Sequence, residues 1–262
     1  MAQEFEIRVI SLLNQADRRE RIVRIFDGQS VDWSFFNAIP GHAIADFLKM
    51  YDRKKRLQYL GYDLRDNEIA CFLSHRKIWE ECVQKNKPFL VLEDDVKICE
   101  QMQNFSQVAE CVDFLIHSIH SHFLFIRLGN LFQRKFQRIK TVKDGLTVVR
   151  YHRDPSTAMA YIISPDVAKR LLSNSRSFFC AVDNYMWRGW EHGCCLLDLS
   201  PALFFTSDAD TPSTIGDRSK PAMGFFRKIK REFYRAVDAN KRSNYEKSII
   251  QYLVKNESKI FE

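Results

Sequence analysis

The sequence predicts an α/β fold, in which helices flank a central sheet, followed by a helical region at the C-terminus. Three observations support this prediction. A strand–helix–strand unit opens the chain, an apolar strand in the middle ends in three successive acids, and strand and helix patterns alternate up to about residue 200. With 262 residues, the chain is long enough for one large α/β domain with an appendage.

The opening unit comes first in the chain. Residues 5–13 (FEIRVISLL) have the apolar content of a strand and form too short a run for a typical helix. An amphipathic helix follows, and residues 31–37 (VDWSFFN) resemble a second strand that ends in the turn AIPG at 38–41. A β–α–β opening of this kind is typical of α/β folds that bind nucleotides at their strand ends.

The central apolar strand, residues 88–92 (PFLVL), runs directly into Glu93, Asp94 and Asp95. Because side chains alternate along a strand, we expect Glu93 and Asp95 to share one face and Asp94 to point to the other. Carboxylates at the C-terminal edge of a parallel strand lie where open α/β sheets bind ligands, and their hard oxygens suit Mg²⁺ or Mn²⁺ held together with a phosphate. The alternative is that these acids are only solvated or cap the next helix. A glycosidase pair fits less well, because its carboxylates flank the substrate about 5–10 Å apart.

Two further polar residues have both a structural and a functional interpretation. His75 lies on the apolar arc of a helix that begins near Asp66 and leads into the acidic strand. It is either a satisfied core residue or part of the helix surface that flanks the ligand site. Asp183 stands at the predicted start of a short helix, either as its N-cap or as a general base that faces the metal site.

The remaining elements continue the alternation. They are predicted as a helix over 108–119, a strand over 123–128, a loop or hairpin over 131–145, strands over 147–151 and 156–163, a helix from Ser164 and Pro165 to Leu172, and a strand over 195–199. Gly129 and Asn130 mark another candidate edge of the ligand site. Residues 206–221 are rich in Ser, Thr, Asp, Gly and Pro, which predicts a mobile loop able to close over a ligand.

The net charge of +7 is concentrated in the C-terminal region. Residues 220–262 carry 11 Lys and Arg against 5 Asp and Glu, so the rest of the chain is close to neutral. Apolar residues of this region, among them Ile229 and Phe233, recur at helical spacing between basic residues. A basic amphipathic helix suits an anionic membrane surface, and the alternative is a helix packed on the body with a cationic outer face. A near-neutral body argues against nucleic acid as the main ligand.

Cysteine spacing and hydropathy indicate the compartment. The seven cysteines have no C-x-x-C spacing, so we expect reduced core residues and neither disulfides nor a zinc site. No apolar run is long enough to cross a bilayer, and the first residues do not form a signal peptide. We therefore expect a cytoplasmic protein.

Several of these stretches together resemble glycosyltransferase family 25, which includes lipooligosaccharide galactosyltransferases and their collagen-modifying relatives. The matching pieces follow the family order over roughly residues 5–217: VISL at 9–12 with Arg18 and Arg19, AIPG at 38–41, EIACFLSHRKIW at 68–79, VLEDDV at 91–96, TAMAYIIS at 157–164, VDNYM at 182–186 and STI at 213–215. The combination of a Ser-His helix with a following LEDD is the specific part. Residues 220–262 lie outside it.

The resemblance implies a GT-A-like catalytic domain over residues 1–219, a nucleotide-binding sheet flanked by helices, with residues 220–262 as a basic amphipathic helical region. It also implies inverting transfer of galactose from UDP-galactose to a sugar hydroxyl of a lipooligosaccharide or lipopolysaccharide core. We expect a lipid-linked oligosaccharide acceptor, an anionic membrane surface bound through the basic tail, and no nucleic-acid partner. The expected location is the inner face of the bacterial inner membrane.

The resemblance also implies roles for the candidate residues. Glu93 and Asp95 are the expected ligands of Mn²⁺ or Mg²⁺, and Asp183 is the expected general base; whether Glu93, Asp94 or both accompany Asp95 at the metal stays open. The residues expected to contact the donor are Ser11, Leu12, Arg18, Ala38, His75, Asp94 and Asn130. Tyr161 and Trp187 are expected to offer aromatic faces to the acceptor sugar.

Two alternatives remain open. The donor hexose is undetermined, because galactose and glucose differ at one hydroxyl. A different metal-dependent nucleotide enzyme, such as a nucleotidyltransferase, would need a glycine-rich or basic phosphate-binding loop near the first strand. The chain has nine glycines, and they do not cluster there, which weighs against that class.

Overall fold

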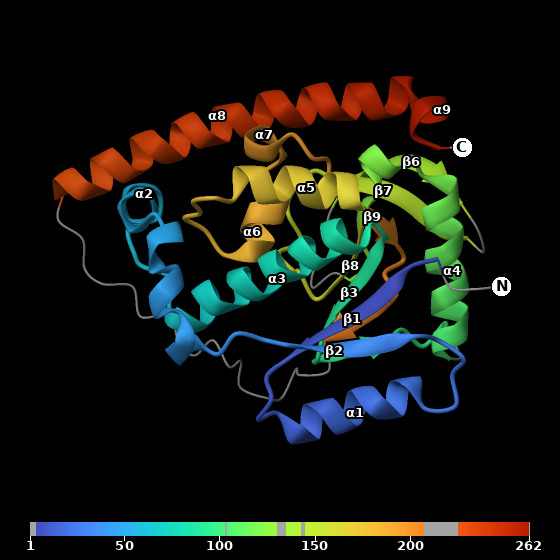
Figure 1. Cartoon of the computed structure of the whole chain (residues 1–262). Coiled ribbons are helices and arrows are strands. Elements are labelled where there is room, and N and C mark those ends of the chain that lie inside the picture. Colours follow the sequence, from blue (N-terminus) through green and yellow to red (C-terminus); the bar gives the residue numbers. More distant parts are fainter. Residues whose placement is uncertain (1–3, 103, 130–134, 143–144, 207–224, 262) are drawn as a thin grey trace.

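The fold is built on an eight-stranded mixed sheet with helices on both faces (Figure 1). The computed structural model describes residues 4–102, 104–129, 135–142, 145–206 and 225–261. The strand order is β2-β1-β3-β8-β5-β9-β7-β6, and a separate two-stranded sheet pairs β10 with β4. This arrangement confirms the predicted α/β class and is consistent with a GT-A-like fold.

The elements have the following bounds. The strands are β1 (Glu6–Ser11), β2 (Trp33–Asn37), β3 (Phe89–Glu93), β4 (Val96–Ile98), β5 (Phe125–Arg127), β6 (Phe136–Thr141), β7 (Thr147–Tyr151), β8 (Ala160–Ile163), β9 (Leu197–Ser200) and β10 (Phe204–Thr206). The α-helices are α1 (Ala16–Phe26), α2 (Arg53–Tyr59), α3 (Asp66–Lys85), α4 (Phe105–Ser118), α5 (Pro165–Asn174), α6 (Val182–Trp187), α7 (Gly189–His192), α8 (Phe225–Lys255) and α9 (Glu257–Ile260). Short 3₁₀ turns cover η1 (Gly41–Ala43), η2 (Ala45–Met50) and η3 (Ser121–Phe123).

The pairing of the strands brings the candidate site together. Strand β1 pairs in parallel with both β2 and β3, so Ser11, Asn37 and Glu93 lie at the same edge of the sheet. Strand β8 runs antiparallel between β3 and β5, which places the segment that enters β8 at this edge as well. The edge therefore combines three strand ends with one strand beginning.

Each face of the sheet has its own hydrophobic core. The first core lies between the sheet and helices α1 and α4, and the second lies between the sheet and helices α3, α5 and α6. On β3, Leu90 and Leu92 belong to the first core while Phe89 and Val91 belong to the second. Because the strand is buried on both faces, its sequence is one continuous apolar run.

Two segments differ from their sequence prediction. The strand expected over 156–163 begins only at Ala160, because local bonds occupy the backbone before it: Asp154 accepts from the Ser156 N–H at 2.9 Å, and Thr157 Oγ1 accepts from the Met159 N–H at 3.1 Å. The small sheet of β4 and β10 was not predicted, because three-residue strands carry no readable periodicity. The hairpin expected over 131–145 is confirmed where it is described, as β6 pairs antiparallel with β7.

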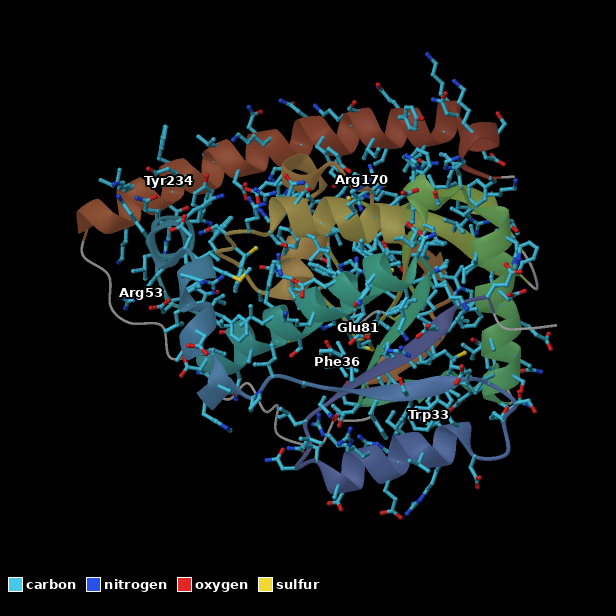
Figure 2. The ribbon with its side chains drawn as sticks, viewed as in Figure 1. Trp33, Phe36, Arg53, Glu81, Arg170 and Tyr234 are labelled. Atoms are coloured by element: carbon cyan, nitrogen blue, oxygen red, sulfur yellow. The ribbon has the colours of Figure 1, made fainter. Side chains whose placement is uncertain are left out.

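The C-terminal helix α8 packs along the body, across α2, α7 and β6 (Figure 1). Tyr234 lies against Tyr59 of α2, with ring centroids 5.1 Å apart, at the end of the molecule that also carries Arg53 (Figure 2). Towards the other end, Leu253 is fully buried in the first core. The inner side of this region is therefore a packed helix, and the predicted domain boundary between residues 219 and 220 lies outside the described residues.

Across the parts of the chain that the structure describes, α8 included, no helix combines the length and the apolar character needed to cross a membrane.

Candidate functional site

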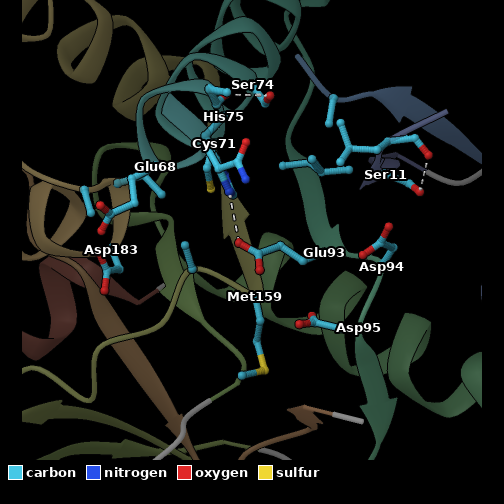
Figure 3. A pocket seen from close by; sticks show the side chains of 18 of the residues that line it. Ser11, Glu68, Cys71, Ser74, His75, Glu93, Asp94, Asp95, Met159 and Asp183 are labelled. Carbon is cyan, nitrogen blue, oxygen red and sulfur yellow. Dashed lines mark hydrogen bonds and ion pairs between the residues drawn. The ribbon is translucent and has the colours of Figure 1, made fainter. Parts of the chain in front are cut away.

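A cavity of about 450 Å³ opens at the sheet edge where β1, β2 and β3 end (Figure 3). Its walls come from these strand ends, the N-terminal half of α3, the segment 156–159, the start of α6 and Thr206 at the end of β10. Such a volume lies in the range of small-molecule sites. Nine of the twelve predicted site residues line it: Ser11, Leu12, Arg18, Ala38, His75, Glu93, Asp94, Asp95 and Asp183.

The three acids leave the sheet one after another. Glu93 ends β3, and its N–H donates to the Met159 carbonyl at 2.7 Å, whereas Asp94 and Asp95 form the turn into β4. All three line the cavity, so the expectation that Asp94 points to the opposite face is wrong. Strand alternation does not extend past Glu93, where the chain turns away from the sheet.

Asp94 is held by helix α1. Arg18 Nη1 donates to Asp94 Oδ1 at 3.1 Å, and Arg21 Nη2 donates to the Asp94 backbone carbonyl at 3.2 Å. Both members of the Arg18–Asp94 ion pair are largely buried at the cavity wall. This pair ties the Asp94 carboxylate to helix α1.

Glu93 is held by a buried chain of side chains from α3 and β8. Trp79 Nε1 donates to the Tyr161 hydroxyl oxygen at 3.0 Å, that hydroxyl lies 2.9 Å from His75 Nδ1, and His75 Nε2 lies 3.2 Å from Glu93 Oε1 (Figure 3). Burial raises the pKa of Tyr161 well above its ordinary value, so its hydroxyl keeps the proton. The Tyr161 O–H therefore donates to Nδ1, and Nε2–H donates to Glu93. His75 is both a satisfied core residue and a contact of the cavity wall.

The same histidine belongs to a second group of metal-ligand type. Ligand atoms of Cys71, His75 and Glu93 all lie within 4.8 Å of one another. A metal on Nε2 would require the proton on Nδ1, and the buried Tyr161 O–H would then lose the nitrogen that accepts its hydrogen bond. Burial also raises the pKa of the Cys71 thiol well above its usual range. The hydrogen-bond chain thus favours Glu93 with its oxygen neighbours over the Cys–His–Glu group as a cation site.

Asp183 lies on the side of the cavity opposite the end of β1, at the start of α6 (Figure 3). Its Oδ1 accepts from the Asn184 N–H at 2.7 Å. Burial raises the pKa of Asp183, and the charges of Asp154 and Glu93 raise it further. It therefore has the position and the raised basicity expected of a carboxylate base.

The ends of β1 and β2 form a short polar rim. The Ala38 N–H donates to the Ser11 carbonyl at 2.9 Å, and the Ile39 N–H donates to Ser74 Oγ at 2.9 Å. These bonds hold Ser11, Leu12 and Ala38 at the cavity, where nucleotide contacts were predicted. Asn130, predicted at the end of β5, lies outside the described residues, as do residues 213–215.

The structure contradicts the expected stacking role of two aromatic residues. Tyr161 is fully buried, and its hydroxyl is hydrogen-bonded to Trp79 and His75. Trp187 is buried with its ring against the Arg150 guanidinium, 3.8 Å from the ring centroid. Neither ring lines the cavity, because each lies in the second core, so a sugar cannot stack on it.

Several cavity residues were missed. Glu68 and Cys71 share a face of α3 with His75 at i, i+3 and i+7 spacing, a signal that the apolar arc around them concealed. The second omission is the buried Arg127, which donates to Asp154 at 3.0 Å and to the Thr157 carbonyl at 3.1 Å and so shapes the cavity wall. Its partners are distant in sequence, so no local pattern identifies it.

A model described as "Glycosyltransferase family 25 (LPS biosynthesis protein)" matches residues 5–186, which is more than half of the chain. The chain belongs to glycosyltransferase family 25. The match contains the whole acidic strand, the Ser-His helix and Asp183, so the family resemblance predicted from the motifs is confirmed.

Individual members of family 25 are similar over different lengths. A lipooligosaccharide biosynthesis protein, lic2B of Haemophilus influenzae, is 27% identical over 166 residues, which cover 62% of this chain and 60% of that protein. A putative glycosyltransferase of the same species is 27% identical over 204 residues, covering 74% of this chain and 68% of that protein. Procollagen galactosyltransferase 1 of Danio rerio is 35% identical over 99 residues, 35% of this chain and 16% of that protein.

Tyr161→Phe tests the buried chain that holds Glu93. It should lower the free energy of unfolding by about 1–3 kcal/mol, because Trp79 Nε1–H and His75 Nδ1 lose their partner in the core. In imidazole ¹⁵N NMR, the wild-type protein should show a protonated Nε2, and the Nδ1 resonance of His75 should move in Tyr161→Phe.

Tyr185→Phe is the matched control, since the buried Tyr185 hydroxyl donates to the Leu171 carbonyl at 2.8 Å in the same core. It should cost comparable stability in chemical denaturation and leave the His75 resonances in place. A proton on Nδ1 of wild-type His75 would contradict the chain.

Proposed function

We propose that this chain transfers a hexose, with galactose as the first candidate, from a UDP-sugar to a sugar hydroxyl of a lipooligosaccharide or lipopolysaccharide core, with inversion. The observation that carries the proposal is the cavity itself, in which Glu93 and Asp95 lie at one wall and Asp183 at another. Relatives named for lipooligosaccharide biosynthesis and for procollagen galactosyl transfer support it. The alternative donor is UDP-glucose, which differs at one hydroxyl.

The divalent cation of this proposal would be held by Glu93 and Asp95. Both carboxylates line the cavity, and hard oxygen donors match Mn²⁺ or Mg²⁺. When bound, the cation would neutralise the charge that grows on the UDP leaving group. The Asp94 carboxylate is paired with Arg18, so a cation that bound it would share this carboxylate with the guanidinium. Arg18 is then suited to share its guanidinium between Asp94 and a donor phosphate.

The donor would lie along the ends of β1 and β2. Ser11, Leu12 and Ala38 line this part of the cavity and stand beside Arg18 and the acidic turn. His75 acts through Glu93, whose carboxylate it orients by its Nε2–H. Asn130 keeps its predicted donor role as part of this proposal.

Asp183 is the proposed base that removes the proton of the acceptor hydroxyl. The raised pKa makes it a stronger base than an ordinary aspartate. Because only the ionised carboxylate can accept the proton, the transfer rate should fall as pH drops through the pKa of Asp183. The raised pKa moves this loss to a higher pH than a solvated aspartate would show.

Asp95→Asn tests the cation site. Transfer from UDP-galactose in the presence of Mn²⁺ should fall by about 100-fold or more, since the variant removes a charged ligand, and a chelator should abolish wild-type transfer. Assaying UDP-galactose and UDP-glucose side by side identifies the donor. Glu100→Gln, an exposed acid beyond β4, is the control and should transfer normally. Wild-type turnover by a folded Asp95→Asn protein would remove the metal assignment.

Asp183→Asn tests the base. Its kcat should fall by about 10²–10⁴-fold while the KM for the donor stays near the wild-type value, because a general base acts on the acceptor proton. The remaining rate should lose the acid limb seen in the wild-type pH profile. Asp166→Asn, another acid in the first turn of a helix, serves as the control. If donor affinity collapses instead, Asp183 belongs to the donor site.

The acceptor of this proposal is lipid-linked, and the protein is proposed to act on the cytoplasmic side of the bacterial inner membrane. The surface suited to that membrane lies where α2 meets the first described turns of α8, here called the α2–α8 corner. On α8, Ile229 and Phe233 are 54% and 65% exposed between basic residues. On α2, Leu57 is exposed on the same helix face as Arg53 and Lys54. Apolar side chains among cations suit an anionic bilayer.

Sedimentation with lipid vesicles tests this surface. The protein should bind phosphatidylglycerol-containing vesicles more tightly than phosphatidylcholine vesicles, and salt should weaken the binding. The Ile229→Ser/Phe233→Ser double variant should lose most of the binding. Val254→Ser removes an equally exposed apolar side chain at the other end of α8 and should bind normally. Equal loss in both variants would refute the corner as the docking surface.

A further inference from the structure

Helix α8 is linked through Arg150 to the end of α6, the short helix that carries Asp183. Trp187, the last residue of α6, lies under the Arg150 guanidinium of β7, 3.8 Å from the ring centroid. Arg150 Nε donates to Glu246 Oε2 of α8 at 3.1 Å, and another Arg150 nitrogen donates to the Leu196 carbonyl. Arg150 is about 1% exposed, so this cation is out of water, and the Glu246 carboxylate that it meets is largely buried.

Two further contacts of α8 hold the residues that follow Trp187. Arg188 Nη1 donates to Asp238 Oδ2 at 2.9 Å. The Tyr245 hydroxyl donates to the Cys194 carbonyl at 3.1 Å, and the Tyr245 ring fills the space beside Gly189, where an added Cβ would come within 2.2 Å of its oxygen. Contacts from successive turns of α8 thus fix the chain immediately after α6.

A second buried arginine near Trp187 connects it to the cavity wall. The guanidinium of the buried Arg127 lies 5.7 Å from the centroid of the Trp187 ring. Arg127 also donates to Asp198 at 2.7 Å, and its bond to the Thr157 carbonyl ties it to the cavity wall. Trp187 therefore neighbours one cation that is bonded to α8 and another that is bonded to the wall of the site.

From these contacts we infer that α8 is a brace that positions Asp183. The brace consists of Glu246, Arg150 and Trp187, which act as positioning residues. A helix of six residues has little stability of its own, so its placement depends on tertiary contacts. A base that shifts by a fraction of a bond length loses its alignment with the acceptor proton. The inference rests on the proposed role of Asp183.

The brace also accounts for acids within a basic region. Asp238 and Glu246 are two of the five acids in residues 220–262, and both point inward to arginines of the body. Exposed cations such as Lys228, Lys230 and Lys247 lie on the solvent side. These two acids of the C-terminal region thus serve internal contacts, while these lysines are left for an external partner.

Glu246→Gln tests the brace, with transfer kinetics and amide hydrogen exchange measured on the full chain. We expect kcat to fall about 10-fold, equivalent to about 1.4 kcal/mol, with donor KM changed less than about twofold. Amides of residues 182–187 should exchange faster. Glu257→Gln is the matched control, because Glu257 pairs with Lys140 of β6 at 3.8 Å, away from α6, and both readouts should stay at wild-type values.

A second variant covers the case in which Glu246→Gln does not fold. Trp187→Phe keeps an aromatic face for Arg150 and should retain more transfer than Trp187→Leu at a similar melting temperature. Unchanged exchange in residues 182–187 of a folded Glu246→Gln protein would overturn the brace, and faster exchange with wild-type kcat would overturn its positioning role. Normal transfer by Asp183→Asn would instead refute the proposed base, while the exchange data still report on the brace.

Discussion

The hydrogen bond from His75 Nε2–H to Glu93 is the interaction on which the order of the site depends. It joins helix α3 to the end of β3, and the Tyr161 hydroxyl behind it adds β8. A buried imidazole with one unsatisfied nitrogen would be costly. Loss of either hydrogen bond of His75 should therefore weaken the whole hydrogen-bond network. The carboxylate at the cavity is therefore held by the core of the protein, and the ligand need not organise it.

Buried arginines extend the same principle to the far side of the cavity. Arg127 and Arg150 are each about 1% exposed, and each meets a carboxylate together with a backbone carbonyl. Taking such a cation out of water is costly, and these carboxylates and carbonyls offset part of that cost. These contacts tie β5, β7, α6 and α8 together. The cavity wall that carries Asp183 is therefore held in place by the same contacts.

The local sequence pattern was sufficient to predict the individual strands and helices around the site. The acidic strand, the long helix that carries His75 and the short helix that begins beside Asp183 were all predicted from apolar periodicity and turn chemistry. The wrong and missing predictions concern contacts between residues that are far apart in the sequence. Tyr161 was assigned to the cavity because strand alternation does not reveal which face a helix will cover. The partners of Arg127 and Arg150 lie between 27 and 96 residues away, beyond any local signal.

The place where the family match ends has a consequence for how the site is divided along the chain. The match stops at residue 186, so it contains the candidate site residues and Arg150 but neither Trp187 nor α8. The helix that supports the site therefore lies outside the stretch that carries its chemistry. A hybrid that joins the matched part of one member to the C-terminal helix of another would inherit a complete set of catalytic candidates. Its success would depend on whether the borrowed helix offers a carboxylate to Arg150.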